Sequence, residues 1–439
     1  RDRDPGVALI FTLSALGQSG PGSSRVLIGG AVLSSGILGG WATVNGTEFA
    51  TYAAGPGTTL GVGALGYGGF GSYSAANLTT PPTSADNVKI NATPGSNLND
   101  TTVNSLNIAA PTAAVTVTMN AAQTLTLASG GLLINDSGNF GVTFTGGAVT
   151  AGTNSSASEL FAYVNTTTGA QRIISQITDN TAGGSVSLVK GGPSTLTLVP
   201  ALANTYTGRT VVNAGTLALA GSTGVVAVPG TLDINGGAVT MTLSAGQIAT
   251  GSTVNVNGPG TLTLFGSNTL AALNFDSRGG NGTPTVTSST INSTGVTQTE
   301  GSAVVTMATV PTGVVVGQYV TGTGVQPGTQ VASVDSPTQV TLTKPVLSTT
   351  TTGTPSFIPL LSLTGGITSL NDTPAFTPTL NGGWALGAAT KTVTVSGQSP
   401  VDLIINAVVV GSGGLIKAGS GTLVLSPAVG AASTFSGGV

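Results

Sequence analysis

The sequence predicts an all-β protein made of stacked repeats, and three observations support this fold class. Apolar and small polar residues alternate with a period of two at residues 195–199, 209–213 and 216–219, as in strands with one buried face. Gly, Pro and Asn separate these runs and leave no room for a helix. The stretch Leu188–Leu219 then returns in part at Leu415–Val439. Imperfect repeats of this kind indicate stacked units that bury their apolar faces together.

The two copies of the repeat correspond position by position over most of their length. The matched positions pair Lys190 with Lys417, Leu196 with Leu423, Leu198 with Leu425, Pro200 with Pro427, and 206–208 with 435–437. A shorter element, Gly-Thr-Leu with Leu or Ile two residues later, begins at Gly215, Gly230, Gly260 and Gly421. The repeat therefore has an internal β rhythm as well as a long period.

This pattern resembles the autotransporter-associated β-strand repeat of bacterial surface and secreted passenger proteins. Leu188–Leu219 resembles it closely, with Arg209 where a glycine is usual, and Leu415–Val439 resembles its first two thirds. Residues 37–50 are similar to a block found in long proteins of this kind. The resemblance implies a right-handed parallel β-solenoid (β-helix) that is secreted or lies on the cell surface. It implies no particular ligand or activity.

Residues 1–100 are expected to form an N-terminal solenoid segment. Within them, residues 7–16 predict a buried strand, and the glycine-rich residues 61–71 predict a loop. Three aromatic residues are expected in the core or at corners: Trp41, Phe49 and Tyr52.

Residues 101–285 are expected to form the central solenoid repeats, with rungs of about 20–25 residues. No window combines apolar residues at helical spacing with good caps. Strands are predicted from residue 87 onward at 87–91, 103–108, 115–119, 124–127, 132–135, 142–144, within 159–178 and 231–243, and at 254–258 and 261–265.

Residues 286–357 differ from the rest of the chain. Their strands are longer, and turns such as Gln326–Gly328 indicate antiparallel hairpins. The sequence therefore predicts a small antiparallel β module inserted in the solenoid, with Thr-rich linkers such as 348–353 at its flanks. Residues 358–439 are expected to resume the solenoid as C-terminal repeats.

The composition excludes several classes of protein. Only 6% of residues are charged, against about 25% typically, so rows of Thr, Ser and Asn must keep the surface soluble. The 39% hydrophobic content and low charge argue against disorder. Eleven Lys and Arg residues form no patch, which argues against nucleic-acid binding. No apolar run reaches the length of about 18 residues that spans a membrane, so no membrane insertion is expected.

Candidate chemical motifs have simpler structural explanations. Gly61–Gly66 matches a dinucleotide-binding string, but no helix is expected after it. Ser187–Lys190 matches a Ser-x-x-Lys motif, but it falls on a strand, and the lysine is expected to have a solvated head. The oxygen-rich segments 135–139, 233–235 and 279–282 could suggest calcium, but turns and Asn stacking explain them better.

The sequence supports no individual site residue. There is no His and no Cys, and the 14 acidic residues form no cluster that can be assigned to one face. Sequons such as Asn45–Thr47 are as numerous as the composition alone would generate. We therefore predict no enzyme, no catalytic residue, no cofactor and no metal site.

Two functions remain as hypotheses. The first is structural: a β-solenoid building block of a bacterial surface fibre, sheath or matrix filament, which could assemble end to end. Its partners would be copies of itself, end to end or lateral, or adjoining repeats of a longer chain. The second is an adhesin or passenger stalk whose inserted module contacts a surface or a glycan. Exposed aromatic residues in that module would support the second hypothesis, and its candidates are Tyr319 and Phe357.

Overall fold

Every regular element of the described chain is a β-strand. The computed structural model describes residues 4–12, 16, 24–53, 61–109, 111–136, 138, 140–166, 168–427 and 433–438. No helix in these ranges is long and apolar enough to cross a membrane. The chain forms two compact units. Unit 1 is Arg1–Ala218 with Val225–Gly230, and unit 2 is Leu219–Gly224 with Thr231–Val439.

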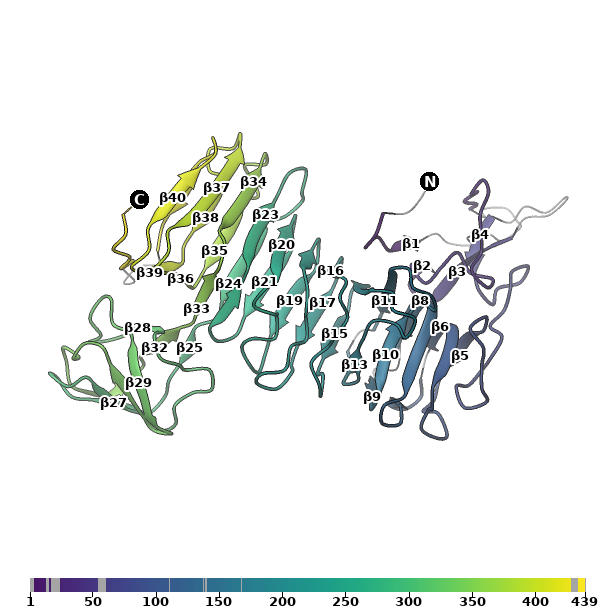
Figure 1. Cartoon of the computed structure of the whole chain (residues 1–439), viewed down its shortest axis with the longest axis horizontal. Helices are drawn as coiled ribbons and strands as arrows, with labels where there is room; N and C mark the ends of the chain where they lie inside the picture. The colour runs from purple at the N-terminus through teal and green to yellow at the C-terminus, as the bar shows by residue number, and fades with distance from the viewer. Residues whose placement is uncertain are drawn as a thin grey trace. The chain divides into compact units, whose positions relative to one another are not determined.

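Unit 1 contains two ladders of parallel strands, part of which is the blue stack in Figure 1. The first ladder consists of β5 (Asn87–Ile90), β6 (Thr101–Ala109), β8 (Thr124–Asn135), β11 (Ser158–Val164), β14 (Val186–Gly191) and β16 (Thr210–Val212). In addition, β10 (Ala148–Ala151) pairs with β8, and β13 (Gln176–Ile177) pairs with β10. The second consists of β7 (Val115–Thr118), β9 (Val142–Thr145), β12 (Gln171–Ile173) and β15 (Thr195–Leu198). β17 (Thr216–Leu219) lies where the chain passes from one unit to the other.

Unit 2 contains three ladders of parallel strands, drawn from teal to yellow in Figure 1. The first is β18 (Leu232–Ile234), β20 (Thr253–Asn257), β23 (Ala272–Asp276), β34 (Ile367–Asn371), β37 (Lys391–Gly397) and β40 (Leu415–Ala418). The second is β19 (Ala238–Met241), β21 (Thr261–Leu264), β24 (Thr285–Ser288), β35 (Thr379–Asn381), β38 (Leu403–Ile405) and β41 (Leu423–Leu425). The third is β22 (Asn268–Leu270), β33 (Leu360–Leu363), β36 (Gly383–Gly387) and β39 (Val408–Gly411).

The strands place apolar residues inside and small polar residues outside, as their alternation predicts. On β20, Val254 and Val256 are fully buried, while Asn255 between them lies on the outer face. Partners on neighbouring rungs are 22 residues apart for Asn255 and Asp233, and 19 apart for Asn274 and Asn255, close to the expected spacing. The predicted all-β parallel solenoid is confirmed in each unit.

The first hundred residues depart from the expected solenoid. β1 (Leu9–Phe11) and β2 (Ala42–Val44) are parallel, but β2, β3 (Glu48–Ala53) and β4 (Gly61–Ala64) pair antiparallel. The parallel rungs begin only at β5. The strand predicted at residues 7–16 is formed over β1, but Leu9 and Ile10 are 42% and 43% exposed rather than buried, and residues 13–15 lie outside the described part.

The loop predicted at residues 61–71 is also wrong at its start. Gly61–Ala64 is strand β4, because the small residues fit a tightly packed sheet. A side chain at Gly63 would meet the ring of Phe70, about 2.2 Å from a Cβ built there. Glycine is required here by close packing and not by a turn.

The inserted module is antiparallel throughout, as predicted. Its strands are β25 (Ile291–Asn292), β26 (Val296–Gln298), β27 (Val304–Thr306), β28 (Tyr319–Thr321), β29 (Val331–Ser336), β30 (Gln339–Leu342), β31 (Thr350–Gly353) and β32 (Ser356–Ile358). They enclose a small core that includes Val296, Val340 and Phe357. The residues predicted as a Thr-rich linker instead include β31, because β-branched Thr suits a strand and β31 pairs with β26.

The solenoid register continues across the insertion. β24 pairs with β21 before the module and with β35 after it. Hydrogen-bonded partners on these two rungs, Thr287 and Asn381, are 94 residues apart in sequence. The module is therefore an excursion between two neighbouring rungs. The division of the chain into 1–100, 101–285, 286–357 and 358–439 remains a prediction.

Candidate functional site

Lys190 on β14 is the most unusual ionisable group in the repeat. Its side chain is fully buried. Its Nζ donates to the carbonyl oxygens of Gly191 at 2.6 Å, Gly192 at 2.9 Å and Ala214 at 3.1 Å. Burial lowers the pKa of this amine to about 7. The expectation of a solvated head is wrong here, because three inward-facing carbonyls replace water around the amine.

The Ser-x-x-Lys string does not assemble a catalytic pair. Residues three apart on a strand point to opposite faces, so Ser187 and Lys190 diverge. The Ser187 hydroxyl accepts a hydrogen bond from the Arg209 amide at 3.2 Å, while the Lys190 amine contacts carbonyls. Both residues are used to join one rung to the next.

The acidic residues of two segments considered for calcium, 135–139 and 233–235, are used within the fold. Asp136 is buried, and its carboxylate accepts from the Gly141 amide at 2.8 Å and the Gln171 side-chain amide at 3.1 Å. Asp233 accepts from Asn255 at 2.6 Å. In the described ranges no three acidic, His or Cys side chains gather to hold a metal ion.

Asp233 belongs to a ladder of stacked polar side chains in unit 2. Asn255 donates to Asp233, and Asn274 donates to Asn255 at 2.8 Å, one rung further along. A second ladder links Asn406 to Asn381 at 3.1 Å and Asn381 to Thr287 at 3.3 Å. The polar rows that the composition required therefore lie on the outside of the parallel sheets and stabilise the stacking.

One cluster of ionisable side chains joins the N-terminal sheet to the first rungs. The Glu48 carboxylate accepts from Lys89 at 2.5 Å and from the Tyr73 hydroxyl at 2.7 Å. Asn107 donates to the Tyr73 oxygen at 2.8 Å. Burial and the nearby Glu48 charge raise the pKa of Tyr73 well above its usual range. Apart from the Asn107 side-chain oxygen, which has no hydrogen-bond partner among the described residues, these groups satisfy one another, which suits a structural clasp better than a site that acts on a ligand.

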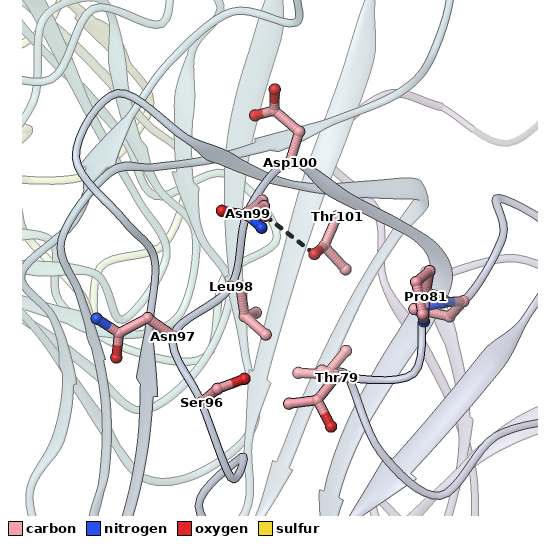
Figure 2. A pocket seen from close by; sticks show the side chains of 10 residues that line it. Thr79, Pro81, Ser96, Asn97, Leu98, Asn99, Asp100 and Thr101 are labelled. Atoms are coloured by element: carbon pink, nitrogen blue, oxygen red, sulfur yellow. Dashed lines mark hydrogen bonds between the residues drawn. The ribbon is translucent and has the colours of Figure 1, made fainter.

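A small polar pocket lies beside the turn that leads into β6 (Figure 2). Its volume is about 150 Å³. Its polar groups are partly used: Asp100 accepts from the Thr124 amide at 2.9 Å, and Thr101 donates to the Asn99 carbonyl at 3.0 Å. Figure 2 shows the residues around it, which are Leu78, Thr79, Pro81, Pro82, Ser96, Asn97, Leu98, Asn99, Asp100 and Thr101.

A larger cleft in unit 1 separates the loop before β2 from strands β8 and β11. Its volume is about 290 Å³. It combines half-buried Trp41 with Glu159 and Phe161, which lie on β11. Sequence reasoning missed this site, because Trp41 and Glu159 lie more than 100 residues apart. Trp41, one of only two tryptophans, was the available signal.

The aromatic residues of the inserted module are not available for binding. Tyr319 and Phe357 are both fully buried. Tyr319 packs against Val408 and Val410 of the solenoid strand β39, and its hydroxyl accepts from the Gly328 amide at 3.0 Å. The aromatic support expected for a glycan-binding module is therefore absent from it. Tyr319 instead fixes the module to the solenoid.

Comparison with known proteins agrees with the repeat. Residues 188–219 and 415–439 match the family model described as passenger-associated-transport-repeat. The chain is 32% identical over 189 residues to the adhesin BmaC autotransporter of Brucella suis biovar 1 (strain 1330), covering 42% of this chain and 5% of that protein. No solved structure matches. The resemblance to autotransporter passenger repeats is confirmed, and the chain spans about a twentieth of the length of that relative.

Proposed function

We propose that the chain is a segment of an adhesin-type passenger exposed on a bacterial surface. In this proposal the solenoid is a stiff support, and the inserted module contacts the surface to which the bacterium attaches. The observation that carries it is the uninterrupted pairing of β24 with strands before and after the insertion. Because the module leaves the ladder of parallel strands intact, its sequence can vary without disrupting the solenoid. The similarity to an adhesin autotransporter also favours this function.

In this proposal the module contacts protein through aliphatic side chains that it exposes. Its aromatic rings are buried, but several branched aliphatic side chains are exposed to water. Apolar groups on a small polar domain favour contact with another apolar surface. The exposed side chains are Val304, Val315, Val316, Val334 and Leu347.

The packing of Tyr319 against β39 is a direct connection between the module and the solenoid, through which a pulling force on the module would be transmitted. Tyr319 is packed against two valines and hydrogen-bonded at its hydroxyl, so its orientation is fixed. Ile358 and Leu360, where the chain returns to the solenoid, pack into the same cluster. The module is therefore held at a surface as well as by its two connections.

Removal of the module tests the proposal. Ile291 and Phe357 are paired antiparallel, so an Asn-Gly turn can replace residues 292–356. We expect beads coated with the intact chain to attach to cultured epithelial cells. Attachment of beads coated with the deletion variant should be as low as attachment of uncoated beads. Leu202→Ser, at an exposed position of unit 1, is the matched control and should not change attachment. Equal attachment of deleted and intact chains would remove the proposal.

A structural fibre is the second candidate. The stacked amide ladders and the low charge favour a role in which rungs carry load. Such a chain would associate with itself at micromolar concentration. Sedimentation velocity distinguishes the candidates, because a fibre component grows with concentration and a displayed passenger does not.

A further inference from the structure

We propose that Lys89 and Asn107 join in an intramolecular amide bond, with Glu48 transferring the protons. The bond links β5 to β6, the strands with which the parallel ladder of unit 1 begins. Glu48 belongs to β3 of the N-terminal sheet. This modification makes the clasp between that sheet and the first rungs covalent. It goes beyond the contact proposed for the inserted module and does not depend on that contact being correct.

The register of the two strands places the reacting side chains next to each other. Lys89 and Asn107 are directly paired in the parallel ladder, so their side chains lie on the same face of strands about 4.8 Å apart. The Glu48 carboxylate reaches both side chains. Its Oε1 accepts from Lys89 Nζ at 2.5 Å, and its Oε2 accepts from Asn107 Nδ2 at 3.1 Å. One carboxylate therefore contacts the nitrogen that would attack and the nitrogen that would leave.

The Asn107 amide is held in the orientation that the reaction needs. Its side chain is completely buried. Besides Glu48, its Nδ2 contacts the Thr47 carbonyl oxygen at 3.1 Å and the Tyr73 hydroxyl oxygen at 2.8 Å. Its Oδ1 has no hydrogen-bond partner among the described residues. A buried amide oxygen without a partner is costly for a purely structural residue, and the cost is explained if this amide reacts.

The surroundings of the three side chains limit access of water. Asn107 pairs on its other side with Leu133, which belongs with Phe49 to a buried apolar cluster. Tyr73 packs against this cluster, and Lys89 Nζ lies 5.1 Å from the centre of the Tyr73 ring. Groups held together by the fold react as in a unimolecular step, and exclusion of water reduces competing hydrolysis of the amide.

The reaction balances with these groups alone. Glu48 takes a proton from the Lys89 ammonium, and the neutral amine attacks Asn107 Cγ to form the new C–N bond. Glu48 then gives the proton to Nδ2, the bond between Cγ and Nδ2 breaks, and ammonia leaves. Ammonia takes the remaining extra proton from Nζ. The products are one secondary amide and one ammonium ion, and no oxidant or cofactor is required.

Mass spectrometry of the unmodified chain tests the proposal. We expect an intact mass that is lower than the mass of the sequence by one ammonia. Trypsin does not cut after an acylated lysine, so digestion of the denatured chain should give one peptide of residues 26–172 and not the two peptides 26–89 and 90–172. Fragment ions from cleavage between residues 89 and 107 should be missing, because the amide holds both parts together.

Three substitutions locate the reaction. Glu48→Gln removes the proton acceptor, so this variant should keep its ammonia and be cut after Lys89. Lys89→Arg keeps the positive charge beside Glu48 but removes the amine, and it should also keep the full mass. Asp276→Asn is the matched control, because it removes the carboxylate of the ion pair with Arg278 in unit 2 and should leave the amide in place. Circular dichroism shows whether each variant folds, and the result on the unmodified chain does not depend on the variants.

Two results would overturn the proposal. One is an unmodified chain with its full mass that trypsin cuts after Lys89, which would leave an ion pair and no bond. The other is a loss of ammonia that maps to an Asn-Gly pair such as Asn45–Gly46 and is reversed by hydroxylamine, because this would identify a succinimide.

Discussion

The two copies of the repeat make the same backbone contacts but treat their lysines differently. The Leu188 amide donates to the Arg209 carbonyl at 2.9 Å, and the equivalent Leu415 amide donates to the Gly438 carbonyl at 3.0 Å. Lys190 is fully buried, whereas the equivalent Lys417 is exposed.

The difference lies in the third acceptor of the amine. Each lysine contacts two carbonyls of its own turn, which for Lys417 are Ala418 at 3.4 Å and Gly419 at 2.6 Å. Lys190 also contacts Ala214, which follows β16 on the next rung. Among the described residues no strand pairs with the second edge of β40. Two of the three acceptors of Lys190 therefore come from the turn that follows it, and the third comes from the neighbouring rung, which lies later in the same repeat.

The largest loss of stability is expected from substitution of a glycine that the two copies of the repeat share. Gly192 and Gly419 both have positive φ, and a Cβ would lie 2.2 Å from the Val164 carbonyl oxygen in one and 2.3 Å from the Val395 carbonyl oxygen in the other. Replacing either with Ala should cost about 3 kcal/mol, because strain and a backbone clash coincide. Urea unfolding should show similar losses. A loss in only one copy would break the structural equivalence.

Substitution of the two lysines should change stability by different amounts in the two copies of the repeat. Lys190→Met leaves buried carbonyls without a donor and should cost about 2 kcal/mol. Lys417→Met removes an exposed side chain and should cost less than about 0.5 kcal/mol. Hydrogen exchange of the peptides around each residue measures the two effects separately. Equal losses would mean that the neighbouring rung does not matter.

The pH dependence of stability should come from the buried lysine. Folding lowers the pKa of Lys190 to about 7, while the unfolded side chain keeps its proton to about pH 10.4. The unfolded state therefore binds more protons between pH 7 and pH 10, and stability should rise with pH by up to about 1.4 kcal/mol per unit. The comparison of Lys190→Met with the unmodified chain isolates this slope. Identical pH profiles would contradict the burial of a titrating amine.

The smallest effect concerns the aromatic residue of the repeat. Tyr206 is buried and its hydroxyl bonds Thr210 Oγ1 at 2.5 Å, whereas the second copy has Phe435 at the equivalent position. Tyr206→Phe should cost about 1 kcal/mol, the contribution of one buried hydrogen bond. Phe435→Tyr is the matched reverse change. An unaltered denaturation midpoint for Tyr206→Phe would show that this hydroxyl does not distinguish the copies.

Local patterns were enough to predict the repeats and most strands. The alternation at residues 253–257 and the turns between rungs depend only on residues close together in the sequence, so they can be predicted from it. Residues 61–64 and 350–353 form strands, but their high glycine and threonine content led to the prediction of a loop and a linker. Their pairing partners lie elsewhere in the chain, where local patterns give no information.

The sites could not be predicted because they depend on contacts over long sequence distances. The burial of Lys190 requires Ala214 on another rung. The cleft beside Trp41 requires Glu159 from a strand more than 100 residues away. The burial of Tyr319 requires β39. In each case the residue type was visible, but its surroundings were set by stacking.

Electron microscopy of the purified intact chain and of the variant that lacks residues 292–356 would test the central claim most directly. A displayed adhesin segment should give separate single-chain particles for both proteins at every concentration, and averaged images should differ only by the density of the module. Ordered filaments that persist after removal of the module would contradict the account and favour a structural fibre.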